Sequence, residues 1–339
     1  MLNLEQFKNR FQKIKGKTIA IVYIFEGDDS DGFNHFFIWK SSILTKWLNA
    51  IEEIHCLPFI VDVRTFVSKA MNHTLPHIDF ILNMNSGTYD LSTMALVPST
   101  CSALGIPCIP CNAVTIVTGE NKKLSNLIAK STGINVPKSI DAANPNGIYR
   151  PINLGNSLGV TRGINSNSKD GIYQEFIQGF DITTPIVYNG MSQHMELLPT
   201  VLYIPESSDY NWFIGENAKK TRSGYTFKTI CLDKQTETKY LELAESLGIK
   251  TFCRIDARVK CTSYKYINTN NLELSFNDIY FIEINVMPTI RDNNNFAYSF
   301  NEINEQHSFY SCKMAQKSLM GDINVHSFLL VNSIFALLK

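Results

Sequence analysis

The chain has 339 residues, of which 44% are hydrophobic and 18% are charged, which is enough for two or three lobes with separate cores. The 31 basic residues balance 31 acidic residues, so no basic field favours nucleic acid and no polybasic run favours a membrane surface. Segment 1–17 lacks the apolar core of a signal peptide, and no apolar run approaches the ~20 residues of a spanning helix.

The eight cysteines are scattered rather than spaced as a disulfide framework, which indicates reduced thiols in the cytoplasm. One pair, Cys108 and Cys111, has the spacing of a redox motif or of half a zinc site. No second Cys pair or His pair has matching spacing, so we favour two small apolar residues after a strand.

The first third of the chain has the pattern of a parallel α/β lobe, which we assign to residues 1–112. We expect apolar strands at 17–25, 57–63 and 78–83, and helices at 37–54 and 92–104. The polar loop 26–32, which begins with Glu26, follows the first strand at the edge where open α/β sheets bind ligands.

The middle of the chain carries several weak signals of a nucleotide site. Lys122 opens a helix, Arg150 lies in a short strand, and the glycine-containing segment 153–159 can present bare backbone N–H groups to phosphate. An edge strand at 174–177 can read the polar edge of adenine, and Asp181 can accept from ribose hydroxyls. Each signal is weak alone, because ordinary surface helices and hairpins carry the same residues.

The C-terminal part begins with a polar segment at 210–224 that is typical of a flexible flap. A helix is expected at 237–247, followed by a strand at 251–259. The Asn- and Tyr-rich segment 261–278 is expected to form a hairpin or a disordered tip, and the chain from 299 onward is expected to be helical and to pack against the sheet.

Two strands of this part carry the strongest chemical signal. Period-two alternation predicts strands at 251–259 and 279–286, each with one aliphatic face. If these faces lie on the same side of one sheet, the other side gathers Arg254, Asp256, Glu283 and Asn285. Two carboxylates and an amide oxygen suit Mg²⁺ when phosphates fill its other positions, and an Arg can hold a developing oxyanion. A solvated face with chance charges is the weaker alternative, because burying uncompensated charges is costly.

In their order these pieces resemble the ATP-grasp superfamily, and within it the D-alanine–D-alanine ligases. The resemblance spans nearly the whole chain and rests on motifs at 104–107 with 121–122, 150–160, 174–181, 216–219, 254–256 and 281–288. It implies an α/β protein with the ATP-grasp fold: an N-terminal parallel α/β domain at 1–112, a central subdomain with a phosphate flap at 113–195, and a C-terminal subdomain with the magnesium site at 196–339.

The resemblance also implies a role for each matching residue. ATP would be bound by Lys122, Arg150, Gly155, Asn156, Ser157, Gln174, Glu175, Phe176, Ile177, Asp181, Lys219 and Ile282. One or two Mg²⁺ would be held by Asp256, Glu283 and Asn285, and the chemistry would be assisted by Arg254, Lys219 and Ser157. In this family ATP phosphorylates a carboxylate and an amine then attacks, while the protein supplies positioning and charge.

The substrate half departs from the family pattern. Arg150 stands where the family normally has Lys, Asn85-Ser-Gly87 replaces an expected His-Gly pair, and Thr289 replaces a Gly. The Ser-Leu pair that holds the acceptor carboxylate has no counterpart within 290–295. The candidate substrate contacts are therefore Glu26, Ser86, Arg291 and Asn294.

We therefore expect an ATP-dependent carboxylate–amine ligase that joins two amino acids or similar small molecules. The alternative is a catalytically inactive ATP-binding homologue, motivated by Arg150 and Thr289. A metal hydrolase is disfavoured, because the sequence has no His-rich ligand set. A homodimer is expected from the family, and no nucleic-acid or membrane partner is expected.

Overall fold

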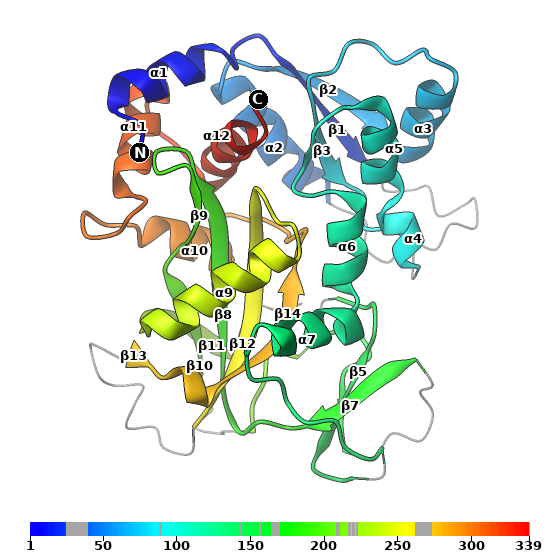
Figure 1. Cartoon of the computed structure of the whole chain (residues 1–339), viewed down its shortest axis with the longest axis vertical. Coiled ribbons are helices and arrows are strands. Elements are labelled where there is room, and N and C mark those ends of the chain that lie inside the picture. The colour runs from blue at the N-terminus through cyan, green and yellow to red at the C-terminus, as the bar shows by residue number, and fades with distance from the viewer. Residues whose placement is uncertain are drawn as a thin grey trace.

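The computed structural model describes residues 1–24, 40–87, 90–142, 144–155, 157–163, 170–207, 211–215, 218, 221, 223–261 and 273–338 (Figure 1). Within these ranges the strands form three sheets, of four, three and seven strands. Glu26, Asn156 and Lys219 lie outside the described residues, as do part of the predicted flap at 210–224 and most of the predicted tip at 261–278.

The four-stranded sheet confirms the predicted parallel α/β lobe. Its strand order is β2-β1-β3-β4, and each neighbouring pair is parallel. The strands are β1 (Thr18–Tyr23), β2 (Leu57–Asp62), β3 (Phe80–Met84) and β4 (Cys108–Ile109). The helices of this part are α1 (Leu4–Gln12), α2 (Ser41–Glu53), α3 (Val63–Met71), α4 (Leu91–Met94) and α5 (Leu96–Leu104).

Two details of this lobe differ from the predicted elements. The sequence pattern did not predict α3, which begins where the side chain of Asp62 accepts hydrogen bonds from the backbone of Arg64 and Thr65. The helix predicted at 92–104 is divided into α4 and α5 at Ala95. The thiol of Cys111 is buried, which raises its pKa and keeps it protonated, as expected of a structural cysteine.

The helix pair α6 (Ala113–Glu120) and α7 (Lys122–Ser131) leads from this lobe into a small antiparallel sheet. The order of that sheet is β6-β5-β7, formed by β5 (Gly147–Pro151), β6 (Thr161–Arg162) and β7 (Gly171–Glu175). The side chain of Asn121 caps α7 by accepting from the backbone N–H groups of Lys123 and Leu124, and this cap places Lys122 in the first turn.

The large sheet has the order β13-β11-β10-β8-β12-β14, with β9 paired to β8. Its strands are β8 (Gly179–Asn189), β9 (His194–Leu197), β10 (Thr200–Pro205), β11 (Tyr225–Leu232), β12 (Phe252–Lys260), β13 (Glu273–Leu274) and β14 (Ile279–Asn285), and a short 3₁₀ turn at Phe276–Asp278 precedes β14. Antiparallel β12 and β14 pair as the alternation predicted, with Arg254 opposite Asn285 and Asp256 opposite Glu283.

One face of this sheet packs on α9 (Lys234–Ser246), where Leu243 joins Ile255 and Ile284 in a common core cluster. The helix begins three residues before the predicted start at 237, because the Asp233 side chain accepts from the backbone N–H of Thr236 and caps it there. Since side chains alternate between the two faces of a strand, the polar residues of β12 and β14 point to the opposite face.

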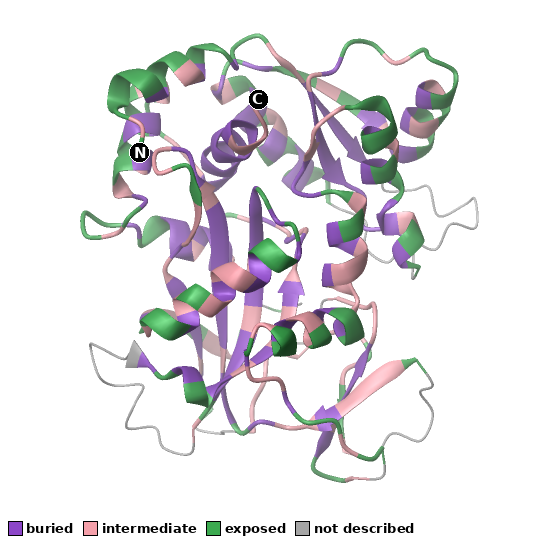
Figure 2. Cartoon of the chain, viewed as in Figure 1, coloured by how far each residue is buried: buried purple, intermediate pink, exposed green. Residues whose placement is uncertain are grey.

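The C-terminal helices are α10 (Asn295–Asn301), α11 (Tyr310–Met320) and α12 (Val325–Leu337), which confirms the expected helical end of the chain. Figure 2 shows α12 buried along most of its length, and its side chains share one core cluster with α1, α2 and β1. Among the described residues no single helix is long and apolar enough to span a membrane; only α11 and α12 together, bent by 104°, reach the required length.

The division of the chain at 112 and 195 stays a prediction. The hydrogen bonding shows that β8, which lies before 195, pairs with both β10 and β12 of the large sheet. If the three-part division holds, this pairing favours a boundary between β7 and β8.

Leu243→Ala tests whether α9 supports the strands that carry the polar residues. Leu243 is fully buried, so its truncation removes apolar contacts and leaves a cavity that costs about 3 kcal/mol of unfolding free energy. Leu127→Ala on α7 is a matched control, because Leu127 is 64% exposed and its loss changes stability by less than about 0.5 kcal/mol. Urea unfolding of both variants measures the difference, and equal effects would contradict this packing.

Candidate active site

A cavity of about 480 Å³ opens on the face of the large sheet that α9 leaves uncovered. Its walls come from β8, β10, β11, β12 and β14, from β5 and β7 of the small sheet, and from the segment that follows β14. The volume is that of a site for a small-molecule ligand. Among the described residues, six cationic side chains and four carboxylates line the cavity. This excess of positive charge suits an anionic ligand.

The structure brings most of the predicted site residues to this one cavity. Those that line it are Lys122, Arg150, Ser157, Gln174, Glu175, Phe176, Ile177, Asp181, Arg254, Asp256, Ile282, Glu283, Asn285, Arg291 and Asn294. Gly155 and Ser86 are described but do not line the cavity, and Ser86 is buried just after β3.

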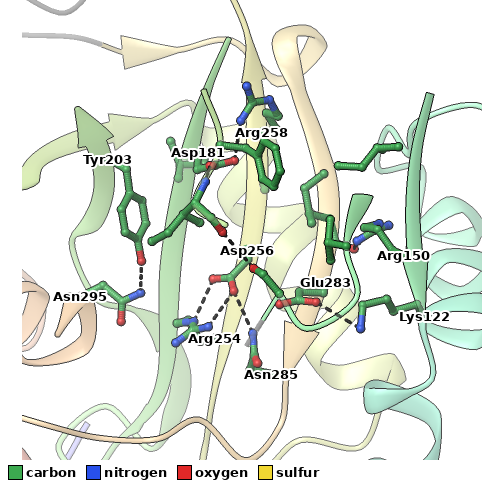
Figure 3. A pocket seen from close by; sticks show the side chains of 18 of the residues that line it. Lys122, Arg150, Asp181, Tyr203, Arg254, Asp256, Arg258, Glu283, Asn285 and Asn295 are labelled. Atoms are coloured by element: carbon green, nitrogen blue, oxygen red, sulfur yellow. Dashed lines mark hydrogen bonds and ion pairs between the residues drawn. The ribbon is translucent and has the colours of Figure 1, made fainter. Parts of the chain in front are cut away.

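The centre of the cavity floor is the carboxylate of Asp256 (Figure 3). Arg254 donates to both of its oxygens, with Nε–Oδ1 and Nη2–Oδ2 distances of 2.8 and 2.7 Å. Asn285 Nδ2 donates to Oδ2 at 2.9 Å, and the Thr183 hydroxyl donates to Oδ1. Burial would lower the pKa of Arg254, but the neighbouring Asp256 raises it overall, so the guanidinium is charged.

Glu283 lies beside this centre and faces a buried lysine. Lys122 Nζ lies 3.5 Å from Glu283 Oε2 and donates to the carbonyl of Leu154 at 2.6 Å. Burial lowers the pKa of Lys122, and the carboxylate of Glu283 opposes this shift. The ammonium of Lys122 therefore connects three parts of the chain: α7, β14 and the segment that follows β5.

Arg150 is buried where the small sheet meets β14. Its guanidinium donates to the carbonyl of Ile282 at 2.6 Å and to Gln174 Oε1 at 2.5 Å. Gln174 in turn donates through Nε2 to the carbonyl of Pro137 at 2.9 Å. Burial lowers the pKa of Arg150 to about 10, so the group is still charged at neutral pH.

Arg258 is a site residue to which the sequence pattern assigned no role. It donates to Asp181 Oδ1 at 2.8 Å and to the carbonyls of Ile177, Gly179 and Trp212. These bonds hold the turn between β7 and β8 against the sheet. In the sequence, Arg258 alternates with Arg254 and Asp256, which places it on the polar face of the strand. That alternation is the one feature from which a role for Arg258 could have been predicted.

Phe176 lies in that turn between two guanidinium groups. The Cζ atoms of Arg162 and Arg258 lie 3.9 and 4.6 Å from the centre of its ring, which is the geometry of cation–π contacts. Asp181 is fixed a second time by the backbone N–H of Ile214, which donates to Oδ2 at 2.7 Å. This end of the cavity is therefore held in place by charge and ring contacts.

The segment after β5 covers part of the cavity. The Ser157 hydroxyl donates to the carbonyl of Ile214 at 2.9 Å, so the segment is tied to the opposite wall. Gly159 has a φ of 68°, a left-handed conformation that glycine adopts without strain. The backbone thus turns sharply back into β6 after crossing the cavity.

Among the predicted substrate residues, Arg291 and Asn294 lie in the segment between β14 and α10. Asn294 has a structural function there, since its side chain caps α10 by accepting from Ala297 N and donates to the carbonyl of Thr289 at 2.7 Å. The segment is therefore held in a defined conformation above the polar floor.

Glu120 is a second residue that the sequence analysis missed. It ends α6 and accepts from the backbone N–H of Val286, one residue after Asn285, at 3.2 Å. Burial raises the pKa of Glu120 from 4.5 to about 7; nearby Lys122 lowers it and Glu283 raises it. A carboxyl in this position changes its charge near neutral pH.

Solved structures show which proteins share this architecture. The D-alanine–D-alanine ligase from Bacillus anthracis complexed with ATP is 16% identical, with a TM-score of 0.60 over 95% of this chain and 97% of its own. A second structure of that ligase is 15% identical, with a TM-score of 0.60 over 94% and 98%. The VanG D-Ala:D-Ser ligase from Enterococcus faecalis is 12% identical, with a TM-score of 0.57 over 94% and 99%.

No protein-family model and no curated protein matches the chain. At identities of 12–16% the likeness to solved structures is one of fold: the chain has the ATP-grasp fold of the D-alanine–D-alanine ligases. The predicted fold class is thereby confirmed over nearly the full length of the chain.

Glu120→Gln tests the raised pKa of this buried carboxyl. The folded-state pKa lies above the unfolded value, so the wild type loses stability as the pH rises from about 4.5 to about 7. The neutral Gln variant does not lose this stability. Between pH 5 and pH 8 its free energy of unfolding should therefore rise relative to that of the wild type by on the order of 1–3 kcal/mol. Urea unfolding at both pH values, with EDTA present, measures it; an unchanged difference would contradict the shift.

Proposed function

We propose that the protein is an ATP-dependent ligase that joins a carboxylate to an amine through an acyl phosphate, with release of ADP and phosphate. One observation carries this proposal: the face of the large sheet that forms the cavity floor brings together Arg254, Asp256, Glu283 and Asn285. The ATP-grasp fold supports it, since the similar solved structures are ligases, one of them complexed with ATP.

In this proposal the nucleotide occupies the end of the cavity next to the small sheet. The base would lie between Phe176, Ile177 and Ile282, with the polar groups of Gln174 and Glu175 at its edge. Asp181 would accept from the ribose hydroxyls. Because these residues come from β7, the turn after it, β8 and β14, binding the nucleotide would engage both sheets at once.

The phosphates would extend from there toward the centre of the floor. Lys122 and Arg150 supply buried positive charge on one side, and the backbone around Gly155 and Asn156 would close over the phosphates from above. Lys219 would approach the same phosphates, as the family resemblance implies. Buried cations hold phosphate oxygens strongly because little water screens them.

The donor set of Asp256, Glu283 and Asn285 fits Mg²⁺. Asp256 and Glu283 are directly paired across two antiparallel strands, a position in which Cβ atoms lie about 5 Å apart. No group of three His, Cys, Asp or Glu side chains gathers within the described ranges, so the third protein ligand would be the Asn285 amide. Mg²⁺ held there would neutralise charge on the transferring phosphate, and phosphate oxygens and water would complete its coordination.

Arg254 would stabilise the oxygens of the reacting acyl group. Asp256 accepts from two of its five N–H donors and thereby fixes the plane of the guanidinium. The remaining donors would face the acyl phosphate and the tetrahedral intermediate that the amine forms with it. Ser157 would contribute its hydroxyl from the covering segment. The chain thus supplies orientation and charge, without a protein nucleophile.

A second function, ATP binding without ligation, is favoured by one observation. Both oxygens of Asp256 already accept hydrogen bonds, and Asn285 turns its donor toward them. A chain held in this arrangement would bind ATP and be stabilised by it without acid-dependent turnover. This alternative makes a different prediction for ADP release.

The eight free cysteines and the requirement for ATP support a cytoplasmic location for the proposed enzyme. A homodimer remains a prediction from the family. The proposed substrates are two small molecules, one with a carboxylate and one with an amine.

The test of the proposed function is ADP release from Mg-ATP with pooled D- and L-amino acids, with mass spectrometry of the products. ADP release that requires an amino acid, and a product that has lost one water from two substrates, are expected. Stabilisation by Mg-ATP in a thermal shift, with no acid-dependent ADP release for any pair, would favour the binding protein instead.

Glu283→Gln should abolish turnover while the fold persists. The variant removes one of two carboxylates from the proposed metal site but keeps the shape of the side chain, so we expect a loss of at least about 100-fold in kcat. Glu242→Gln is the matched control, because Glu242 pairs with Lys239 within α9 and does not line the cavity, so the activity of this variant should equal that of the wild type. Retained activity in Glu283→Gln would remove the proposed metal role.

A further inference from the structure

The end of the cavity beyond Asp181 is lined by aromatic side chains. Tyr203, Tyr225 and Phe227, which we call the aromatic wall, all line the cavity, and the distances between their ring centres are 5.2–5.5 Å. Trp212 and Tyr298 support the wall from behind, at 5.9 Å from Tyr225 and 5.3 Å from Phe227. The rings present a mainly apolar surface, whereas Arg254, Asp256 and Glu283 on the neighbouring floor are ionisable groups.

The strand register explains why these three rings lie on the cavity face. Tyr203 of β10 is directly opposite Phe227 of β11, and Tyr225 lies two residues from Phe227 on the same face. Val201, Thr183, Asp256 and Glu283 form one continuous row across β10, β8, β12 and β14. Tyr203 lies two residues from Val201, so the aromatic wall continues the polar face on which the proposed metal ligands lie.

A buried amide borders the aromatic wall. Asn295 is 5% exposed, lines the cavity and donates through Nδ2 to the hydroxyl of Tyr203 (Figure 3). Its Oδ1 is buried and has no hydrogen-bond partner in the part of the chain that the structure describes. An unsatisfied buried acceptor is costly, and a ligand N–H or O–H group would satisfy it.

Two cations of the cavity come from segments next to this amide and its partner: the charge of Arg254 acts on Tyr203, and the Arg291 carbonyl accepts from the backbone N–H of Asn294. Arg291 comes from the segment before α10 and Arg254 from the neighbouring floor, and both line the cavity. A guanidinium is the group best suited to bind a carboxylate. This end of the cavity therefore combines positive charge, an acceptor for a donor group and a large apolar surface.

These three features match an amino acid with a large side chain. Resting on the proposed ligase function, we propose that the aromatic wall binds the side chain of one substrate, and that this substrate is an aromatic or branched aliphatic amino acid. A methyl or hydroxymethyl side chain would leave the rings of Phe227 and Tyr225 in contact with water. An apolar side chain would displace that water and stack on the wall.

The test measures binding to the full chain separately from turnover. Calorimetric titrations with the D and L forms of phenylalanine, leucine and alanine, in Mg-ADP, give the affinities, and ADP release from Mg-ATP is measured with the same amino acids. Phenylalanine or leucine of one chirality should bind at least about tenfold more tightly than alanine. Phe227→Ala should reduce that preference about tenfold and leave alanine binding unchanged.

Phe59→Ala is the matched control, because Phe59 is a half-buried ring on β2 that does not line the cavity, and this variant should keep the preference. Phe227→Leu serves if the Ala variant does not fold. Alanine binding as tight as phenylalanine, no binding of any amino acid, or an equal loss for all amino acids in Phe227→Ala would overturn the proposal and make the wall a packing feature.

The proposed ligase function fails in a different way. Selective binding of phenylalanine or leucine without ADP release would support the binding role of the aromatic wall and contradict the proposed ligase function. ADP release with alanine or serine alone would keep the ligase and remove the preference for large side chains.

Discussion

The site depends on one physical requirement, that every charge taken out of water must have a partner. Asp256 shows this most clearly, since its two oxygens accept from Thr183, Arg254 and Asn285. Removing one member of such a cluster leaves an uncompensated charge, which costs more than the pair itself contributes. The polar floor is therefore a network whose members fix one another, and a rigid floor is what a site that works by positioning requires.

The same requirement connects the parts of the chain around the cavity. Arg150 joins β5 and β7 to the carbonyl of Ile282 on β14, and Arg258 joins the turn after β7 to β12 and to Trp212. Both guanidinium groups donate to backbone carbonyls as well as to one side chain each, Gln174 and Asp181, so part of this bonding does not depend on the identity of a partner side chain. The contacts that organise the proposed nucleotide end are thus also contacts between the small and large sheets.

The fold and the polar floor were largely predictable from the sequence, because they depend on short periodic patterns. The alternation around Arg254 and Glu283 predicts which side chains share the polar face if the two strands pair, since a slip of one residue would turn every polar side chain into the core. Caps were harder to foresee: because Asp233 caps α9, the helix begins three residues before the predicted start at 237. Ser86, a predicted substrate contact, is buried and does not line the cavity. The sequence could not reveal this, because the order of residues in a loop does not give the direction of a side chain.

The residues that the sequence did not reveal act through contacts between distant segments. Tyr203 and Asn295 reach the cavity from β10 and α10, whereas Glu120 at the end of α6 bonds to the backbone just after β14; no local pattern connects these residues. The side chains of Tyr203 and Asn295 are uncharged, unlike most of the floor, and this difference fits separate functions for the floor and the wall. Phosphate transfer needs fixed charges whatever the substrate, whereas the choice of substrate depends on the shape and polarity of the wall beside them. The family resemblance anticipated the charged floor, whereas the sequence analysis assigned no role to the residues of the aromatic wall.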